Sequence, residues 1–502
     1  MVDSIIMFTN RILTSRFDNR SMKRLYIPFI IIAALLTSCS REITIDKQID
    51  ATADIFPDYI DVTIPCNIAP MNFQLNNAEG IETQLIIKGG DVTFQVKGDE
   101  GDFEIPAKKW KKLLEANLNK DIEFTVCKKE FNGQWTALAP FTMHVTSDKI
   151  DPWLAYRLIP PGYGIWNKMG IYQRCLENFT EKEILTNRET EYNCMNCHAF
   201  QNGNPNKMVM HLRGRHGSSI QVEGKSVKKI EPKMPDGLKG VGYNQWHPTH
   251  NLVAMASYKT AQSFYANHRN RIEVYDTRTD VVVYNSDKEE AYTAPYLADP
   301  AKFQTMPAFS ADGKSIYWSV ADTVADPIPV HYDKAFFSLM RADFDPETCT
   351  FAEKPDTLLN AEVDSCSYMY ARESPNGRFL VFNKYDYGYF PINHKEGDLW
   401  IRDMQTGENR KMDVASSDDA ESYHTWSRNS HWLVFSSRRL DGLFIGAFFT
   451  YIDDNGQDHK AFLMPQRHPR KFYDNQFCSY NIPEFITGEV KADQHSIQQL
   501  VW

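Results

Sequence analysis

Four segments from residue 246 onward repeat one pattern, in which a tight polar turn leads into a strand of bulky apolar residues. They cover residues 246–257, 309–319, 373–383 and 426–436, and they start about 50 to 65 residues apart. Two of the turns contain Gly313 and Gly377, where a tight turn that needs positive φ favours glycine. Strand units of this kind cannot bury their apolar faces alone, so they must stack on one another. The sequence therefore predicts an all-β chain built largely as a β-propeller.

Two of the repeat turns match a known repeat closely. Ser310 to Lys314 reads SADGK and Ser374 to Arg378 reads SPNGR, and residues 398–404 form a later Leu-Trp-containing strand that ends near Asp403. These residues resemble the TolB-like β-propeller repeat, in which S-P-D-G-K leads into one strand and L-W-x-x-D ends a later one. Further strands are expected at 271–276 and 338–343, and the resemblance covers about residues 240–465.

The resemblance implies a propeller, most often of six blades, which closes by pairing its last strand with the first blade. Four blades are visible in the repeats, so the other two are expected from residues 153–235 and from C-terminal strands around 477–490. We therefore assign residues 149–502 to the propeller. Residues 187–240 show little strand pattern and are rich in Asn, Gly, Lys and His, so we interpret them as a long functional insertion.

The insertion contains a C-x-x-C-H motif formed by Cys194, Cys197 and His198. In this haem-attachment signature each thiol can add to one vinyl group of a haem, and the histidine can then ligate the iron. The motif predicts one covalent c-type haem with His198 as the proximal ligand. A redox-active dithiol or disulfide and half of a zinc site are the alternatives for the two thiols.

Four residues that follow the motif are candidates for the sixth iron ligand. His211 is the favoured one, and the alternatives are Met208, Met210 and His216. A second histidine would give a lower reduction potential than a methionine, because thioether sulfur stabilises reduced iron. Met208 and Met210 alternate with an apolar residue, so they also suit an ordinary strand core.

The N-terminal 39 residues have the features of an export signal. Lys23 and Arg24 precede a short apolar run that ends in Leu36-Thr37-Ser38-Cys39. This ending resembles the lipobox of bacterial lipoproteins, which implies that Cys39 is lipidated and becomes the first mature residue. Translation is expected to start at Met22, because residues 1–21 look unlike a targeting segment. We expect a lipid-anchored protein of the bacterial cell envelope, in the outer membrane and facing the periplasm, where covalent haem attachment and disulfides are both possible.

Residues 40–54 are interpreted as a polar tether, and residues 55–148 as a separate β-sandwich domain. The pattern alternates with period two in short strands, with one helix-like stretch at 107–118. About ninety residues of this kind suit an immunoglobulin-like or fibronectin-like sandwich. Cys66 and Cys127 both fall in this domain, where they could form a disulfide or remain buried thiols.

Other cysteine pairs and several polar residues of the propeller are further candidates. Cys175 with Cys478 would form a disulfide across the propeller closure, and Cys349 with Cys366 would form one between blades. Residues near the starts of inner strands approach the channel of a propeller and could bind a ligand. The candidates for this role are His247, His250, Glu373 and His424, all of which also suit ordinary turn and strand-start roles.

Composition and motifs narrow the function. A net charge of −10 argues against nucleic-acid binding, and the sequence contains no G-x-S-x-G, H-E-x-x-H or phosphate-loop motif. We expect a haem protein that acts in electron transfer or redox-linked assembly with another envelope protein, rather than an enzyme. A non-redox propeller scaffold for a protein or glycan partner is the alternative, and a haem peroxidase is a third possibility if the sixth position is vacant.

Overall fold

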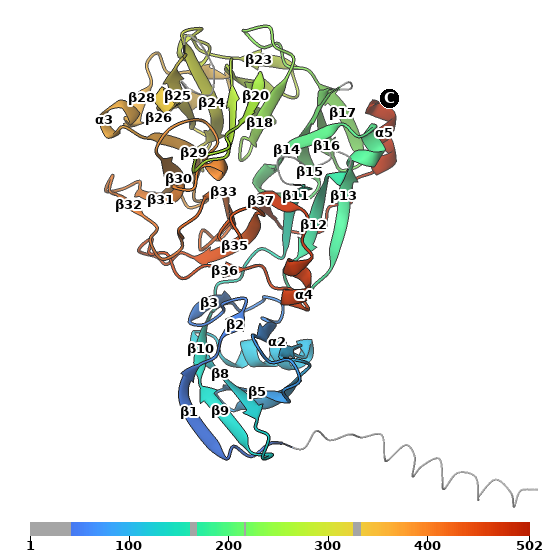
Figure 1. Cartoon of the computed structure of the whole chain (residues 1–502). Helices are drawn as coiled ribbons and strands as arrows, with labels where there is room; N and C mark the ends of the chain where they lie inside the picture. Colours follow the sequence, from blue (N-terminus) through green and yellow to red (C-terminus); the bar gives the residue numbers. More distant parts are fainter. Residues whose placement is uncertain (1–41, 161–167, 215–216, 325–332, 502) are drawn as a thin grey trace, which may run out of the picture. The chain divides into compact units, whose positions relative to one another are not determined.

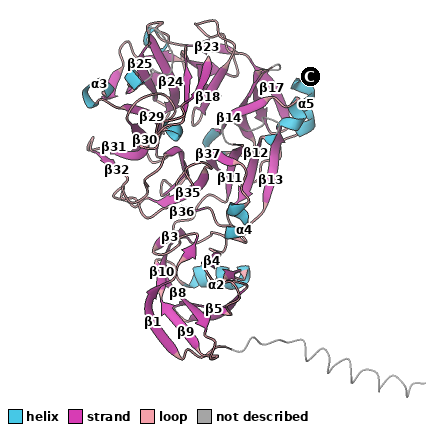
Figure 2. Cartoon of the chain, in the orientation of Figure 1, coloured by secondary structure: helices cyan, strands magenta, loops and turns pink. Residues whose placement is uncertain are grey.

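The computed structural model describes residues 42–160, 168–214, 217–324 and 333–501. Residues Asp46–Trp502 form one compact unit, and Figure 2 shows that strands dominate it. In the described residues, no helix combines the length and apolar character needed to cross a membrane. The expected signal peptide, with its lipobox and Cys39, lies outside the described residues.

Two sheets and one helix form the N-terminal domain. Its elements are β1 (Lys47–Thr52), β2 (Ile55–Phe56), β3 (Val62–Pro65), β4 (Phe73–Leu75), β5 (Thr83–Gly89), β6 (Val92–Gly98), β7 (Asp102–Phe103), α2 (Ala107–Ala116), β8 (Lys120–Lys129), β9 (Trp135–Ala139) and β10 (Phe141–Thr146). The larger sheet has the order β1-β9-β8-β10-β3, with β5 also paired to β8 and β6 paired to β5. The smaller sheet has the order β2-β4-β7. Helix α2 buries Trp110, Leu113 and Leu114 in the same core.

The expected tether is partly structured. Residues 40–54 were predicted to be a polar linker, but β1 pairs in parallel with β9 within that range. All six residues of β1 are exposed or half-buried, so no apolar alternation marked this stretch as a strand. Backbone pairing along the sheet edge holds it in place instead.

Six sheets of the remaining chain form the blades of a propeller. Blade 1 contains β11 (Trp153–Ile159), β12 (Gly170–Cys175), β13 (Glu181–Thr186) and β37 (Ser479–Ile486). Blade 2 contains β14 (Cys194–Phe200), β15 (Lys207–Arg213), β16 (Ser218–Glu223) and β17 (Ser226–Ile230). Blade 3 contains β18 (Val241–Trp246), β19 (Leu252–Ser257), β22 (Val281–Asn285) and β23 (Glu290–Tyr292).

The other three blades follow in chain order. Blade 4 contains β24 (Lys302–Phe309), β25 (Ser315–Asp322), β26 (Ser338–Asp345), β27 (Thr350–Phe351) and β28 (Asp356–Leu359). Blade 5 contains β29 (Ser367–Glu373), β30 (Phe379–Tyr385), β31 (Asp398–Asp403) and β32 (Asn409–Lys411). Blade 6 contains β33 (Glu421–Trp426), β34 (Trp432–Ser437), β35 (Gly446–Tyr451) and β36 (Phe462–Leu463).

The ring closes through the last strand of the chain, as predicted. Strand β37, red in Figure 1, pairs antiparallel with the green β11 and completes blade 1 from the inside. The innermost strands β14, β18, β24, β29, β33 and β37 contact one another in succession around the ring. Apolar cores lie between neighbouring blades. The predicted six-bladed propeller is therefore confirmed, and Gly313 and Gly377 adopt the expected positive φ of 74° and 72°.

Two segments differ from the expectation. Residues 187–240 are mainly a regular blade rather than an insertion, because β14 to β17 pair in order as a four-stranded sheet. Many polar residues in this blade hid its period-two pattern. Residues 271–276 contain β21 (Ile272–Asp276), which pairs with β20 (Thr260–Phe264) as a separate hairpin instead of continuing blade 3. Strand β22 takes that place beside β19.

The N-terminal domain packs against the end of blade 6 and the segment that follows it. The Tyr59 hydroxyl donates to the Leu463 carbonyl at 3.0 Å, and the Trp432 indole donates to the Asp148 carbonyl at 3.0 Å. Asn72 donates to the Arg467 carbonyl at 2.9 Å, just before α4 (Pro469–Asp474). The remaining helices include α3 (Ala361–Asp364) and α5 (Gln494–Val501).

Candidate functional site

The six innermost strands carry the same irregularity at the centre of the propeller. Each strand shifts register once, next to a non-glycine residue whose φ lies between 51° and 55°. The six residues are Cys197, Tyr243, Met306, Tyr370, Tyr423 and Ile482. All six line one cavity of about 90 Å³, which we call the inner cavity. Positive φ is unfavourable for such side chains, and strain of this kind is typical of binding sites held by a rigid framework.

His198 follows the bulge residue of blade 2 and lines the inner cavity. Its side chain is buried, with 1% exposed, and neither ring nitrogen has a hydrogen-bond partner among the described residues. The backbone of Ile482 lies near the ring, but without the geometry of a hydrogen bond. Burial and the charge of Arg157 lower the pKa of His198 to about 3, so the ring is neutral at pH 7. A buried neutral imidazole with two free nitrogens is suited to accept a ligand or a metal.

The two thiols of the motif lie beside two adjacent cavities. Cys194 is half-buried and lines a wider cavity of about 240 Å³, whereas Cys197 is buried in the wall of the inner cavity. A Cβ atom on Gly242 would lie 3.3 Å from the Cys197 sulfur, so the thiol packs closely against blade 3. Burial raises the pKa of the Cys197 thiol. The cavities share Asn196, Phe390 and Tyr423, so the motif extends from one into the other.

Two ionisable side chains, Arg372 and Glu484, line the inner cavity. Enclosure by protein lowers the pKa of Arg372 to about 10 and raises the pKa of Glu484 to about 8, and each group partly offsets the other. Glu484 also accepts a hydrogen bond from the Phe200 amide at 2.8 Å. At neutral pH Arg372 is therefore charged, whereas most of Glu484 is protonated.

The favoured sixth ligand, His211, has partners for both ring nitrogens in this structure. His211 lies on β15 with Nδ1 at 3.1 Å from the Ser219 hydroxyl and Nε2 at 2.5 Å from the Tyr258 hydroxyl. Both nitrogens are therefore engaged, and His211 lines neither cavity. Met208 and Met210 pack in the apolar core between blades 1 and 2. His216 lies outside the described residues.

Of the four predicted channel residues, only His424 lines the inner cavity. Its Nε2 lies 2.9 Å from the Val381 carbonyl, which can only accept, so Nε2 carries the proton and Nδ1 has no hydrogen-bond partner in the described part of the chain. Glu373 accepts from the Tyr317 hydroxyl at 2.7 Å, away from the cavity.

His247 and His250 are also away from the channel. His247 accepts backbone hydrogen bonds at Nδ1 and bonds the Gly313 carbonyl through Nε2 at 3.1 Å, whereas His250 contacts Glu347 at 3.0 Å. They lie just after the innermost strand, so they stabilise a turn. A position beside a repeat turn therefore does not place a residue at the channel.

The predicted disulfides are absent, because all eight described cysteines are unpaired. Pro65, next to Cys66, lies at the end of β3, near the position where Val145 pairs with Lys120. Cys127 lies seven residues further along β8 than Lys120, which is about 23 Å in an extended strand. Strand geometry therefore excludes the Cys66–Cys127 pair and leaves two free thiols.

The other two pairs fail for the same reason. Cys175 lies opposite Trp153, but Cys478 adjoins Ser479, which lies opposite Ile159 at the other end of β11. In the third pair, Cys349 follows the Asp345 end of β26, whereas Cys366 is tied through Ala361 to Ser338 at the other end. Each pair is thus separated by most of a strand, or about 20 Å.

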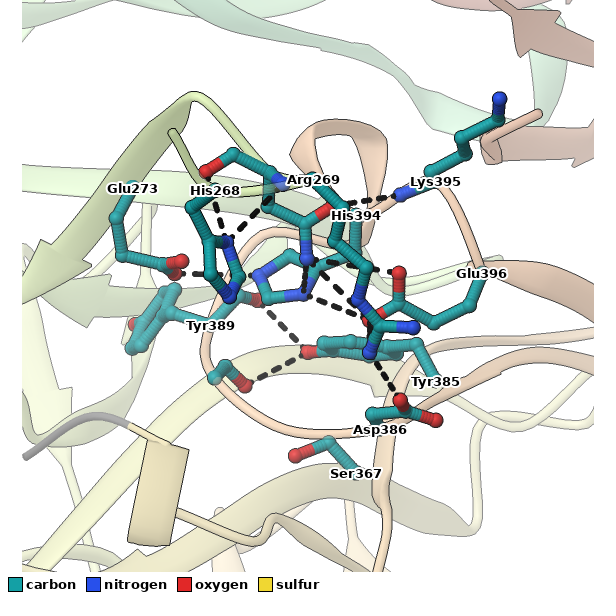
Figure 3. A network of polar contacts seen from close by, with 12 residues as sticks. His268, Arg269, Glu273, Ser367, Tyr385, Asp386, Tyr389, His394, Lys395 and Glu396 are labelled. Carbon is teal, nitrogen blue, oxygen red and sulfur yellow. Dashed lines mark hydrogen bonds and ion pairs between the residues drawn. The ribbon is translucent and has the colours of Figure 1, made fainter. Parts of the chain in front are cut away.

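A second buried polar cluster, which we call the His394 network, lies between blade 5 and the hairpin β20–β21 (Figure 3). His394 Nε2 lies 3.2 Å from Glu273, and Nδ1 lies 3.4 Å from Glu396. Arg269 contacts Glu396 at 3.1 Å and also pairs with Asp386. Burial lowers the pKa of His394, but hydrogen bonds to Glu273 and Glu396 outweigh it and raise the pKa to about 9. Sequence inspection gave no sign of this network, because its members lie far apart along the chain.

The ring of bulge residues was also missed, although a signal for it exists. In each innermost strand the bulge residue precedes a large residue by three positions: Phe200, Trp246, Phe309, Glu373, Trp426 and Phe485. Four of these residues, Trp246, Phe309, Glu373 and Trp426, begin the repeats found from sequence. Counting back three positions would have found Tyr243, Met306, Tyr370 and Tyr423.

Comparison with known proteins gives likenesses to solved structures only. No protein-family model matches the chain, and no curated protein matches it. TolB from Acinetobacter baumannii is 12% identical with a TM-score of 0.42, covering 76% of this chain and 85% of that one. A hypothetical selenium-binding protein from Sulfolobus tokodaii is 7% identical with a TM-score of 0.43, covering 69% and 96%.

A third likeness is to the periplasmic gluconolactonase of Pseudomonas aeruginosa, which is 13% identical with a TM-score of 0.35, covering 63% of this chain and 97% of that one. At such identities and TM-scores these likenesses carry no functional information. The propeller itself is established by the strand pairing.

Proposed function

We propose that this chain is an exported envelope protein that holds one covalent haem in its propeller channel and exchanges electrons with a protein partner. The observation that carries the proposal is His198, a neutral and buried imidazole with no partner at either nitrogen among the described residues. Buried polar groups without a partner are costly and call for an explanation. An iron ligand role would explain this one.

The residues present fit the chemistry of a covalently held haem. Cys194 and Cys197 supply the two thiols, and they line the wider cavity and the inner cavity, respectively. His198 supplies a nitrogen ligand, and its lowered pKa keeps the ring unprotonated at neutral pH. When bound, the haem would supply an iron that takes up and releases one electron at a time.

The surrounding side chains would control what reaches the site. The ring residues Tyr243, Tyr370 and Tyr423 line the inner cavity and would limit the access of water to a bound haem. His424 lines the inner cavity, and its Nδ1 has no partner among the described residues. It therefore replaces His211 as the histidine candidate for the sixth iron ligand. The rigid bulges of six strands would hold these groups in place without rearrangement.

Export and anchoring form part of the same proposal. Covalent haem attachment takes place outside the cytoplasm, and the lipobox ending at Cys39 supports delivery to the cell envelope, with the lipid in the outer membrane and the protein facing the periplasm. A single haem cannot form an electron path alone, so an envelope redox partner is required. Replacing Cys39 by Ala should release the protein from membranes, and continued tight association would refute lipidation.

The haem is tested by the absorbance of the exported protein, expressed together with haem-maturation machinery. We expect a Soret band in the wild type that survives denaturation, as a covalent haem would, and its loss in Cys194→Ser/Cys197→Ser. Cys349→Ser is the matched control, because this buried thiol lies outside both cavities. A wild type with no Soret band would refute the proposal. A five-coordinate high-spin iron would favour a haem enzyme instead of an electron-transfer protein.

A non-redox scaffold is the second candidate, and the ring favours it. Cys197 occupies the position that Tyr243, Met306 and Tyr370 occupy in other blades. It therefore forms part of the channel wall whether or not it attaches a haem. Propellers commonly use this channel to bind a ligand or partner. Absence of haem together with saturable binding of a protein or glycan at the channel would favour this candidate.

A further inference from the structure

The wider cavity has a positive wall. Three arginines line it: Arg157, Arg213 and Arg438, from blade 1, blade 2 and the segment after β34. No aspartate or glutamate belongs to the described residues that line this cavity. In a chain with a net charge of −10, an acid-free wall with three cations is unexpected. Asp276 acts on Arg213 and Asp419 acts on Arg438, but neither carboxylate lines the cavity.

Each arginine is fixed in place and still has bonding capacity. The Nε of Arg157, Arg213 and Arg438 has no hydrogen-bond partner among the described residues. Arg213 lies over the Tyr258 ring at 4.1 Å, and Arg438 donates to the Asn393 side chain at 2.9 Å. Arg157 is 7% exposed and donates to the Met195 carbonyl at 3.4 Å. Anchored guanidinium groups that are short of partners form a preorganised site for a carboxylate.

The rest of the cavity wall is mainly apolar. It contains Ile159, Met169, Ile272, Val274, Phe390 and Ile445. A small inorganic anion would satisfy the arginines but leave this apolar surface uncovered. The combination suits an organic anion whose carboxylates meet the arginines while its body covers the apolar wall.

We propose that the wider cavity binds the carboxylates of an apolar organic dianion through Arg157, Arg213 and Arg438. The same chemistry has two sources, which are the propionate groups of a haem attached at Cys194 and a soluble dicarboxylate. The inference does not rest on the proposed function, because a soluble ligand would satisfy it in a protein without thiols in the channel. It assigns the arginines a role that the C-x-x-C-H motif does not predict.

The test uses the full chain with Cys194→Ser/Cys197→Ser, so that nothing binds covalently. Three probes are used: binding of the two porphyrins is measured by quenching of tryptophan fluorescence, and binding of azelate by titration calorimetry. Metal-free protoporphyrin IX carries two carboxylates, its dimethyl ester carries none, and azelate is a soluble dicarboxylate. We expect protoporphyrin IX to bind at least about tenfold more tightly than its ester, since charge-assisted bonds to guanidinium are lost on esterification. Because these probes contain no iron, His198 does not contribute through iron ligation.

Single substitutions keep the test informative if a combined variant does not fold. Arg213→Gln and Arg438→Gln should each weaken binding of the dicarboxylate about tenfold and leave binding of the ester unchanged. Arg402→Gln is the matched control, because this arginine bonds to Asn409 on the exposed side of blade 5, away from the cavity. Thermal unfolding of each variant checks that the fold is intact.

Each outcome decides between the sources or overturns the inference. Tight binding of protoporphyrin IX supports the haem source, and binding of azelate alone supports a soluble dicarboxylate. Equal affinity for the dicarboxylate and its ester, or loss of binding in Arg402→Gln equal to that in Arg213→Gln, overturns the inference. So does the absence of binding for all three probes. The proposed function fails separately, through the lack of a Soret band in the wild type.

Discussion

Two buried polar clusters in this propeller differ in how their charges are balanced. In the His394 network, every charged group has an opposite charge nearby: His394 lies between Glu273 and Glu396, and Arg269 lies beside Asp386 (Figure 3). Around the channel, His198 and the three cavity arginines have polar atoms with no partner among the described residues. The two buried histidines show the contrast directly, with pKa values of about 9 and about 3.

The comparison separates a structural role from a binding role. A buried charge that is paired within the chain needs nothing further, and its effect is to fix two elements to each other. A buried polar group that lacks a partner lowers stability, so it is retained where a ligand supplies the missing interaction. We therefore interpret the His394 network as a clamp between the hairpin β20–β21 and blade 5, and the channel cluster as a ligand site.

The largest effect is expected from breaking a pair in the His394 network. Glu273→Gln removes one carboxylate from a buried histidinium and should lower the free energy of unfolding by about 4 kcal/mol. Glu115→Gln is the control, because Glu115 forms an exposed helix pair with Lys111, and such pairs contribute less than about 1 kcal/mol. Urea unfolding measures both variants. Similar losses in the two would remove the distinction between the clusters.

The network should also make stability depend on pH. The folded-state pKa of His394 is about 9, above the unfolded value of about 6.5. Its stabilisation is therefore fully present below about pH 6.5 and is lost as the pH rises through 9. The stability difference between the wild type and His394→Gln should shrink by roughly 3 kcal/mol between pH 6 and pH 10. A difference that stays constant over this range would show that His394 is not charged in the fold.

A smaller effect, of opposite sign, is expected in the channel. His198→Leu in protein made without haem should leave stability unchanged or raise it by about 1 kcal/mol, since no hydrogen bond is lost. His211→Leu should instead cost about 2 kcal/mol, because Ser219 and Tyr258 lose their partner. Thermal unfolding compares the two. If His198→Leu is as destabilising as His211→Leu, the imidazole has a structural partner and the account of the channel is wrong.

The smallest effect concerns the cysteines. With no disulfide among the described cysteines, reduction should change the unfolding free energy by less than about 0.5 kcal/mol. Alkylation of the denatured, unreduced protein without haem should modify Cys66, Cys127, Cys175, Cys349, Cys366 and Cys478 alike. A strong stabilisation under oxidising conditions would show that a pair forms after all and that part of the stability comes from a crosslink.

The repeats were sufficient to predict the fold, because turn chemistry and strand periodicity are local properties. Gly313 and Gly377 marked two turns, and the resemblance to the TolB-like repeat implied six blades closed by the last strand. Blade 2 was mistaken for an insertion because its strands contain many polar residues. The edge strand β1 was taken for a tether because it buries almost none of its side chains.

The site was predicted only in part, because its contacts join distant segments. The C-x-x-C-H motif predicted that Cys194, Cys197 and His198 act together, because the three residues lie close to one another in sequence. Arg157 and Arg438 meet at the wider cavity from blades 1 and 6, and no local pattern predicts that meeting. His211 and the three alternatives were chosen because they follow the motif closely in sequence, but His211 lies against Ser219 and Tyr258.

The central claim is that Cys194 and Cys197 hold a haem beside His198, and the mass of the intact exported protein tests it most directly. We predict a mass that exceeds that of the mature chain by one haem, with the excess absent from Cys194→Ser/Cys197→Ser and present in Cys349→Ser. A wild-type mass equal to that of the chain alone, or lower by the two hydrogens of a Cys194–Cys197 disulfide, would contradict the account.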